Sequence, residues 1–169
     1  HGPSGMAGEF GHMPADPGGV PCKCGATGCL ETLASGSAVE RMAREAAEAG
    51  RPVRYKNAGP GQKLSARQVH EAARAGDPTA RAIWARLGRA LGESAGGLVN
   101  ALSLDLLILG GKVSRAHRLF VPEMKKAMRR RAFKYPGARL QIRLGRLGDQ
   151  AALLGAGAIA FGLGRERNS

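Results

Sequence analysis

Three cysteines and one histidine form the densest group of metal-binding side chains in the sequence. Cys22, Cys24 and Cys29 follow the spacing C-x-C-x4-C in PCKCGATGC. His12 lies ten residues upstream of the first cysteine, in GEFGHM. Three thiolates and one imidazole nitrogen complete a tetrahedral Cys3His site, for which zinc is the favoured metal, while iron shares the same ligand types. The spacing therefore predicts a closed four-ligand zinc site, and such sites are usually structural.

The alternative for these residues is one disulfide and one free thiol. The chain holds three cysteines, and its first residues show no basic region followed by an apolar run, the pattern of a secretion signal. Disulfides are rare in the cytosol. We therefore expect a cytoplasmic protein whose cysteines bind metal.

Two glutamates stand beside the predicted ligands. Glu9 is three residues before His12, and Glu31 is two residues after Cys29. Held at one metal site, two carboxylates and an imidazole would offer fixed hydrogen-bond partners to a polyhydroxylated ligand. The alternative is that both are solvated loop acids, which is the commoner state of glutamate.

The elements after the cysteines must position this loop, and they begin as short helices. Ser37 with Glu40 forms the capping-box pattern of a helix that stops at Gly50, and Ser65 with Gln68 starts a second one.

A long buried helix is expected from Asp77 and Pro78, which read as an N-cap and first helical residue, to about Leu102. Its apolar residues fall on one stripe. A glycine inside a helix costs about 0.8–1.0 kcal/mol relative to alanine. Close packing on another element is therefore expected at four glycines: Gly88, Gly92, Gly96 and Gly97.

The remainder alternates between strand and helix patterns. Residues 105–111, DLLILGG, read as a strand buried on both faces, and a helix is expected to start near Pro122. Residues 140–144 alternate in polarity like a half-exposed strand, and residues 150–161 read as a small-residue helix. This order predicts an α/β fold.

Composition and charge limit the function classes. The 169 residues are 43% hydrophobic, enough for one domain, and hold no apolar run long enough to span a membrane. The net charge is +13, with twelve Lys or Arg against one acid between residues 112 and 146. This stretch is either a nucleic-acid surface or a solvated face that attracts a phosphorylated substrate. Aromatic residues are only 4% of the chain, which disfavours base stacking.

The segment AGEFGHMPADPGGVPCKCGATGCLETLASG closely resembles the zinc- and sugar-binding signature of the ROK family (repressors, open reading frames and kinases). LDLLILGGKVSRA resembles the family's nucleotide-side strand and glycine turn, and LGDQAALLGAGAIAF resembles its terminal helix. The resemblance implies the carboxy-terminal lobe of an actin-like, hexokinase-like (ribonuclease H-like) ATPase fold with a Cys3His zinc loop. It would divide into a zinc and sugar loop (1–36), a helical region (37–104) and a nucleotide-side α/β region (105–169).

The same resemblance implies a role for each matching residue. Zinc would be held by His12, Cys22, Cys24 and Cys29, and sugar hydroxyls would be contacted by Glu9, His12 and Glu31. Gly110 and Gly111 would line the ATP site, where the absence of side chains lets the backbone approach a nucleotide. The parent protein would be a homodimeric, glucokinase-like kinase that phosphorylates a hexose with ATP and Mg2+.

The sequence departs from the family pattern in several places. It contains no D-x-G-G-T phosphate loop, and none of its aspartates lies in a segment resembling the one that carries the family's general base. We therefore expect that the amino-terminal ATP lobe and the catalytic aspartate are missing and that the isolated chain is inactive. Lys112 stands where a third glycine is frequent, and Gln150 where an acid is frequent, which puts the nucleotide contacts in doubt.

Two rival functions remain from the sequence. The same region would serve as the effector-binding domain of a ROK sugar-responsive repressor, in which a separate helix-turn-helix binds nucleic acid. Alternatively, the chain is a small zinc-binding nucleic-acid or interaction domain that uses its basic stretch.

Overall fold

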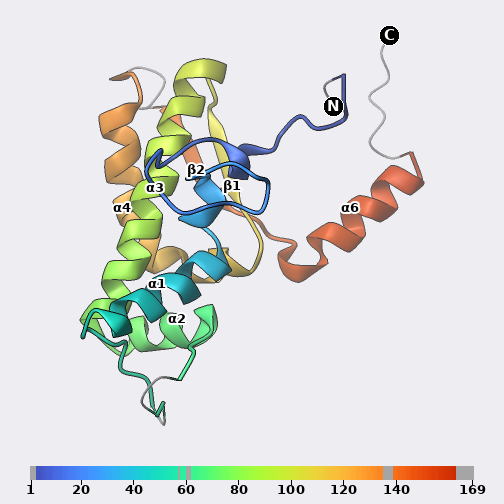
Figure 1. Ribbon diagram of the computed structural model, residues 1–169. Coiled ribbons are helices and arrows are strands. Elements are labelled where there is room, and N and C mark those ends of the chain that lie inside the picture. Colours follow the sequence, from blue (N-terminus) through green and yellow to red (C-terminus); the bar gives the residue numbers. More distant parts are fainter. Residues whose placement is uncertain (1–2, 57, 60–61, 135–138, 163–169) are drawn as a thin grey trace.

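The computed structural model describes residues 3–56, 58–59, 62–134 and 139–162, and these form an α/β arrangement (Figure 1). Parts of all three predicted regions, 1–36, 37–104 and 105–169, lie outside the described residues. The helices and strands are α1 (Gly36–Glu48), α2 (Ala66–Arg74), α3 (Pro78–Leu102), β1 (Leu106–Leu109), α4 (His117–Arg131), β2 (Gln141–Leu144) and α6 (Ala151–Ala160). Short 3₁₀ helices are η1 (Phe10–His12), η2 (Leu30–Thr32), η3 (Lys112–Ala116) and η4 (Gly148–Gln150). Strands β1 and β2 pair in parallel, with Leu107 opposite Ile142.

Two of the predicted helix starts are confirmed by their caps. Ser65 and Gln68 form a complete capping box at the start of α2. At α3, one carboxylate oxygen of Asp77 accepts a hydrogen bond from the Ala80 amide at 2.7 Å. Its other oxygen accepts from the Arg54 amide at 3.1 Å. Asp77 therefore caps the longest helix and also fastens the loop that precedes α2.

The predicted start of α1 is wrong by two residues. Ser35, not Ser37, is the N-cap, because its hydroxyl accepts from the Ala38 amide at 3.1 Å. The Ser37 hydroxyl pairs with that of Ser35. Glu40 reaches across to α2 and accepts from the Ala66 amide at 3.1 Å. The carboxylate that resembled a capping-box partner thus caps the neighbouring helix.

Close packing is confirmed for three of the four glycines in α3. A Cβ built on Gly88 would lie 2.3 Å from the carbonyl oxygen of Phe120, and one on Gly92 would lie 2.2 Å from that of Met124. One on Gly96 would lie 2.8 Å from the Cβ of Arg131. Gly97 differs, because nothing lies within 4 Å of its built Cβ. It faces a pocket of about 430 Å³ that Met13 and Arg130 also line.

The expectation that β1 is buried on both faces is wrong. Leu107 and Leu109 pack against the helical core, but Leu106 and Ile108 are 46% and 60% exposed. The helical core covers one face of a two-stranded sheet, and no described element covers the other. A continuous apolar run cannot distinguish these two cases by itself.

The helix predicted to begin near Pro122 begins five residues earlier, at His117. Phe120 and Met124, on either side of the proline in the chain, are both buried, so packing holds the first turn in helical form. Pro122 itself is exposed. Burial of Phe120 therefore outweighs the usual preference of proline for the first helical position.

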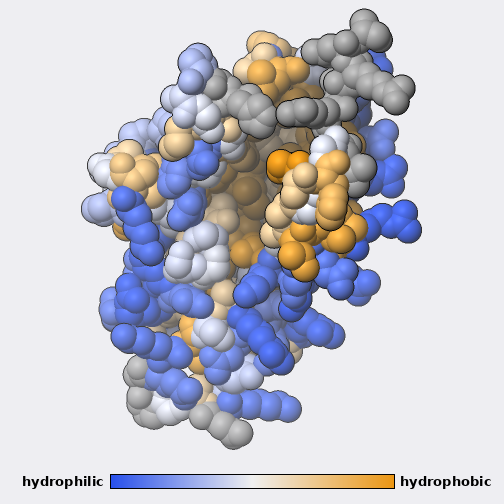
Figure 2. All heavy atoms as spheres, turned by 90° about the vertical axis from the view of Figure 1, so that its right-hand side faces the viewer, coloured by the Kyte–Doolittle hydropathy of each residue, from blue (hydrophilic) through white to orange (hydrophobic). Residues whose placement is uncertain are grey.

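A second apolar surface lies on α6, which projects from the rest of the chain (Figure 1). None of its residues is buried, and Leu153 and Ile159 are 76% and 80% exposed. Figure 2 shows apolar residues gathered on the side of the molecule towards which α6 projects, beside a hollow in that face. A helix that is apolar all round is normally buried. This surface and the open side of the sheet therefore call for a covering element.

Among the described residues, no helix combines the length and apolar character needed to cross a bilayer.

Replacing Asp77 with alanine is expected to lower the free energy of unfolding by about 1–2 kcal/mol, since it removes an N-cap and a link to the loop. Urea denaturation measures this loss. Asp105→Ala is the matched control, because that carboxylate is exposed and makes no described hydrogen bond. Equal midpoints for the two variants would show that the cap contributes nothing.

Candidate metal centre

Residues 22–26 form a tight turn that carries two of the cysteines of the cluster. The Cys22 amide donates to the Ala26 carbonyl at 2.7 Å, and the Gly25 amide donates back to the Cys22 carbonyl at 3.1 Å. Gly25 has φ +92°, a conformation that favours glycine. The turn therefore folds Cys22 and Cys24 to the same side.

The segment of residues 28–30 brings the third cysteine beside η1. Cys29 is the N-cap residue of η2, and the next amide, that of Leu30, donates to the Met13 carbonyl at 2.9 Å. A Cβ built on Gly28 would lie only 1.5 Å from the Asp16 carbonyl oxygen, so only glycine permits this approach of the two segments. His12, directly before Met13, is thereby placed next to Cys29.

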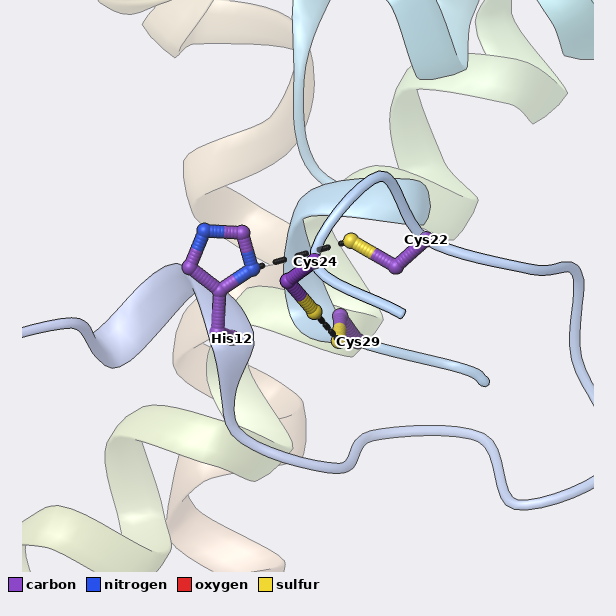
Figure 3. Close-up of side chains that lie close together, drawn as sticks. All are labelled: His12, Cys22, Cys24 and Cys29. Atoms are coloured by element: carbon purple, nitrogen blue, oxygen red, sulfur yellow. Dashed lines mark hydrogen bonds between the residues drawn. The ribbon is translucent and has the colours of Figure 1, made fainter. Parts of the chain in front are cut away.

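The four predicted ligands come together. Their ligand atoms, one per residue, all lie within 4.8 Å of one another. The Sγ atoms of Cys24 and Cys29 are 3.5 Å apart, and His12 Nδ1 lies 3.6 Å from Cys22 Sγ (Figure 3). The sequence-based prediction of a Cys3His cluster is confirmed as a spatial arrangement.

The electrostatics of this cluster fit a bound cation. Burial, together with hydrogen bonding to Cys24, raises the pKa of the Cys29 thiol to about 12. The Ala26 amide and the neighbouring thiols lower the pKa of Cys24. A buried thiol resists ionisation unless a positive charge compensates it, and a zinc ion bound by thiolates supplies that charge. Three thiolates and an imidazole also match the ligand preference of zinc.

The loop around the cluster has little else to stabilise it. From Phe10 to Thr27 no residue is buried. Ordering a residue costs about 1–2 kcal/mol of backbone entropy, which apolar burial normally offsets. In this loop the compensating free energy would come from the hydrogen bonds of the loop and from a metal ion held by the cluster.

Both predicted carboxylates lie on the outer side of the histidine. Its Nε2 is 3.8 Å from an oxygen of Glu9 and 3.8 Å from an oxygen of Glu31. Nδ1 is directed at the thiols, so a metal ion held by the cluster would bind Nδ1 and leave Nε2 as the nitrogen that donates a hydrogen bond. The glutamate side chains are 59% and 48% exposed, so a ligand from solvent can reach them. The three groups together offer one donor and two acceptors.

The predicted nucleotide glycines lie at the carboxyl end of β1. Gly111 has φ +76°, and no heavy atom lies within 4 Å of a Cβ built on either Gly110 or Gly111. Ligands of open α/β sheets commonly bind beyond the carboxyl ends of parallel strands. The backbone at this turn is therefore open to a ligand on the expected side of the sheet.

One residue near the site escaped the sequence analysis. Arg41 in α1 donates a hydrogen bond to the carbonyl of Thr32 in η2, directly after Glu31. In the sequence, Arg41 and Glu45 have the spacing of an ordinary surface ion pair. No pattern in the sequence distinguishes this arginine from its neighbour Arg44.

The chain is similar to known proteins in both sequence and structure. The family model described as the ROK family matches residues 1–162. A glucokinase of Halalkalibacterium halodurans is 35% identical over 162 residues, which are 93% of this chain and 48% of that protein. The crystal structure of a Streptomyces griseus ROK glucokinase in complex with glucose and AMPPNP aligns at TM-score 0.73 and 32% identity, over 90% of this chain and 51% of that one.

A transcriptional regulator is at least as similar in structure. The crystal structure of a ROK-family regulator, a homologue of the Escherichia coli MLC protein, aligns at TM-score 0.79 and 30% identity, over 93% of this chain and 39% of that one. The chain spans about half the length of the curated glucokinases that it matches. Similarity alone therefore does not separate a kinase from a regulator.

Proposed function

The chain belongs to the ROK family, and we propose that it is the sugar-recognising, carboxy-terminal half of an ATP-dependent hexose kinase. The observation that carries the proposal is the shared position of His12. One ring nitrogen faces the thiols of the cluster, and the other faces two exposed carboxylates.

In this proposal His12, Cys22, Cys24 and Cys29 hold a structural zinc ion. The metal ion fixes the imidazole ring, so that Nε2 presents its hydrogen in a constant direction. Glu9 and Glu31 accept hydrogen bonds from sugar hydroxyls, while the imidazole donates one to a hydroxyl oxygen. Three rigid partners of mixed polarity are suited to orienting a polyol.

The nucleotide side of the proposal rests on the turn after β1. The bare backbone at Gly110 and Gly111 would line the ATP site, and ATP would bring Mg2+ with it. The phosphate loop and the catalytic aspartate would belong to the other half of the parent protein. Two observations support such a half: the matched relatives are about twice as long, and the apolar face of α6 and β1 has no described cover.

Phosphoryl transfer depends on positioning and charge neutralisation at the phosphates. Without a phosphate loop or a general base, the isolated chain would bind a hexose without phosphorylating it. Residues 1–36 would form the zinc and sugar loop, residues 37–104 its helical support, and residues 105–169 the nucleotide side.

The second candidate function is the effector-binding half of a sugar-responsive repressor, favoured by the similarity to the MLC homologue. The sugar contacts would be the same, but ATP would have no role. The open glycine turn supports the kinase. The gene upstream of this segment decides between them, because D-x-G-G-T indicates a kinase, whereas an added helix-turn-helix indicates a repressor.

Glu31→Gln is expected to weaken hexose binding by about tenfold or more, because a charged acceptor is replaced by a neutral amide at a hydroxyl contact. Isothermal titration calorimetry with glucose and N-acetylglucosamine measures the change, and metal analysis on the same sample should show unaltered zinc. Glu48→Gln is the matched control, since this glutamate is 68% exposed on α1. Equal affinities of the Glu31 variant and the control would remove Glu31 from the site.

The third hypothesis for the function is a small zinc-binding nucleic-acid or interaction domain. It predicts salt-dependent binding to DNA that Glu31→Gln leaves unchanged.

A further inference from the structure

Arg41 is held more firmly than a surface arginine. Its side chain is only 19% exposed. One guanidinium nitrogen, Nη1, lies 2.5 Å from a carboxylate oxygen of Glu45, and the other, Nη2, donates to the Thr32 carbonyl at 2.7 Å. Arg44, on the next position of the same helix face, is 54% exposed and lies 3.8 Å from Glu48. The contrast shows that Arg41 has a contact beyond its helix.

The carbonyl that Arg41 binds ends the η2 turn. The last carbonyls of a helix have no partner within it, and a basic side chain can satisfy them. Inside the turn, the Thr32 hydroxyl and amide both donate to the Cys29 carbonyl, at 2.7 and 2.9 Å. Glu31 therefore sits within a closed turn, one residue before the carbonyl that Arg41 fixes.

The two ends of this turn are anchored by different means. At its start, Cys29 belongs to the metal cluster, and the Leu30 amide donates to Met13. At its end, Arg41 provides a side-chain link from the turn to α1. Loss of the metal ion and loss of Arg41 should therefore disturb different parts of the segment.

We propose that Arg41 is a positioning residue that holds Glu31 in the direction needed to bind a sugar hydroxyl. This role rests on the sugar site proposed above. The arginine fixes the peptide group that joins Thr32 to Leu33, and without this bond the carboxyl end of the turn that carries Glu31 would be held less firmly. The planar guanidinium makes both bonds at once, whereas lysine has a single ammonium centre and cannot span the two acceptors in the same way.

The test compares Arg41→Met and Arg41→Lys with Arg44→Met in the same chain. Arg41→Met is expected to weaken glucose binding by about tenfold, because a displaced Glu31 would lose its charged hydrogen bond with the sugar hydroxyl. Arg41→Lys should recover part of that affinity. Arg44→Met should change affinity by less than about twofold, as for exposed ion pairs. Calorimetry gives the affinities, and metal analysis should give equal zinc content in all variants.

Hydrogen exchange adds a readout that does not involve sugar. In Arg41→Met, the amides of Leu33 and Ala34, which both donate to the Leu30 carbonyl, should exchange faster. The exchange rate of the Cys22 amide, which lies in the turn of residues 22–26, should be unchanged.

Three outcomes would overturn the proposal, and each is distinct. Equal glucose affinity in Arg41→Met and Arg44→Met removes the positioning role and leaves the sugar site intact. Loss of zinc in Arg41→Met assigns the arginine to metal retention instead, and the same result in Arg41→Lys settles it if the methionine variant does not fold. Absence of glucose and N-acetylglucosamine binding by the unsubstituted chain contradicts the proposed function itself.

Discussion

Chelating zinc from the native chain is expected to release the segment from Phe10 to Thr27 while α1 to α4 stay folded. No residue of this segment is buried, so metal ligation would be its main source of stability. Structural zinc binding has apparent free energies of about 10–16 kcal/mol in zinc-finger peptides, and much of it is folding free energy. Hydrogen exchange should show loss of protection at the Cys22 and Gly28 amides, which are hydrogen-bonded in the folded loop.

The same experiment on Cys29→Ser provides the control. This variant should already resemble the chelated protein, and chelator should then change little further. Far-UV circular dichroism should remain helical in both cases, since the packed helices do not include the loop. Unchanged amide protection after complete zinc removal would show that the loop is stable without metal.

Gly92→Ala is expected to destabilise the fold by about 3 kcal/mol, within the range for overpacked interiors. The new methyl group would lie 2.2 Å from the backbone oxygen of Met124, which can move only if α4 moves. Gly97→Ala should do the opposite and add about 0.8–1.0 kcal/mol, because the helix gains a better residue and the methyl group meets no atom.

These two variants test the contact between α3 and α4, because each adds the same methyl group to α3, once facing α4 and once facing open space. Urea denaturation with a shared slope gives both differences in unfolding free energy. A stabilising effect at both positions would show that α3 and α4 are separated more widely than the structure has them.

Local signals in the sequence predicted a helix start correctly where only one residue nearby could act as the N-cap. Ser65 and Asp77 are such cases. Ser35 and Ser37 both fit the pattern, and only the hydrogen bond of the Ala38 amide selects the first. The cap that Glu40 provides joins two helices through residues that lie 26 positions apart in the sequence. A local pattern holds no information about such a partner.

Burial was harder to predict than element type. The run LLIL predicts a strand correctly, but whether a second layer covers it depends on chain that lies far away in sequence or outside it. The four glycines of α3 also look alike in the sequence. Three meet α4 and one meets a pocket, because the two helices contact each other along only one stripe.

The candidate site followed from the sequence as a set of residues but without orientation. The spacing placed His12, the cysteines and the two glutamates together. It could not show that Nδ1 faces the thiols and Nε2 faces the carboxylates, since this depends on the geometry of η1. Arg41 was missed because its partner is a backbone carbonyl, which no residue type reports.

The most direct test of the account combines metal analysis with thermal unfolding of the chain in increasing hexose concentrations. A ligand that binds the native state raises the unfolding temperature, and about 100 times its dissociation constant adds ~2.7 kcal/mol. The account predicts one zinc ion per chain and a rise in unfolding temperature with at least one hexose, and Glu31→Gln should make this rise clearly smaller at the same hexose concentration. One zinc ion per chain with no rise in any hexose would leave the fold in place and contradict the sugar site.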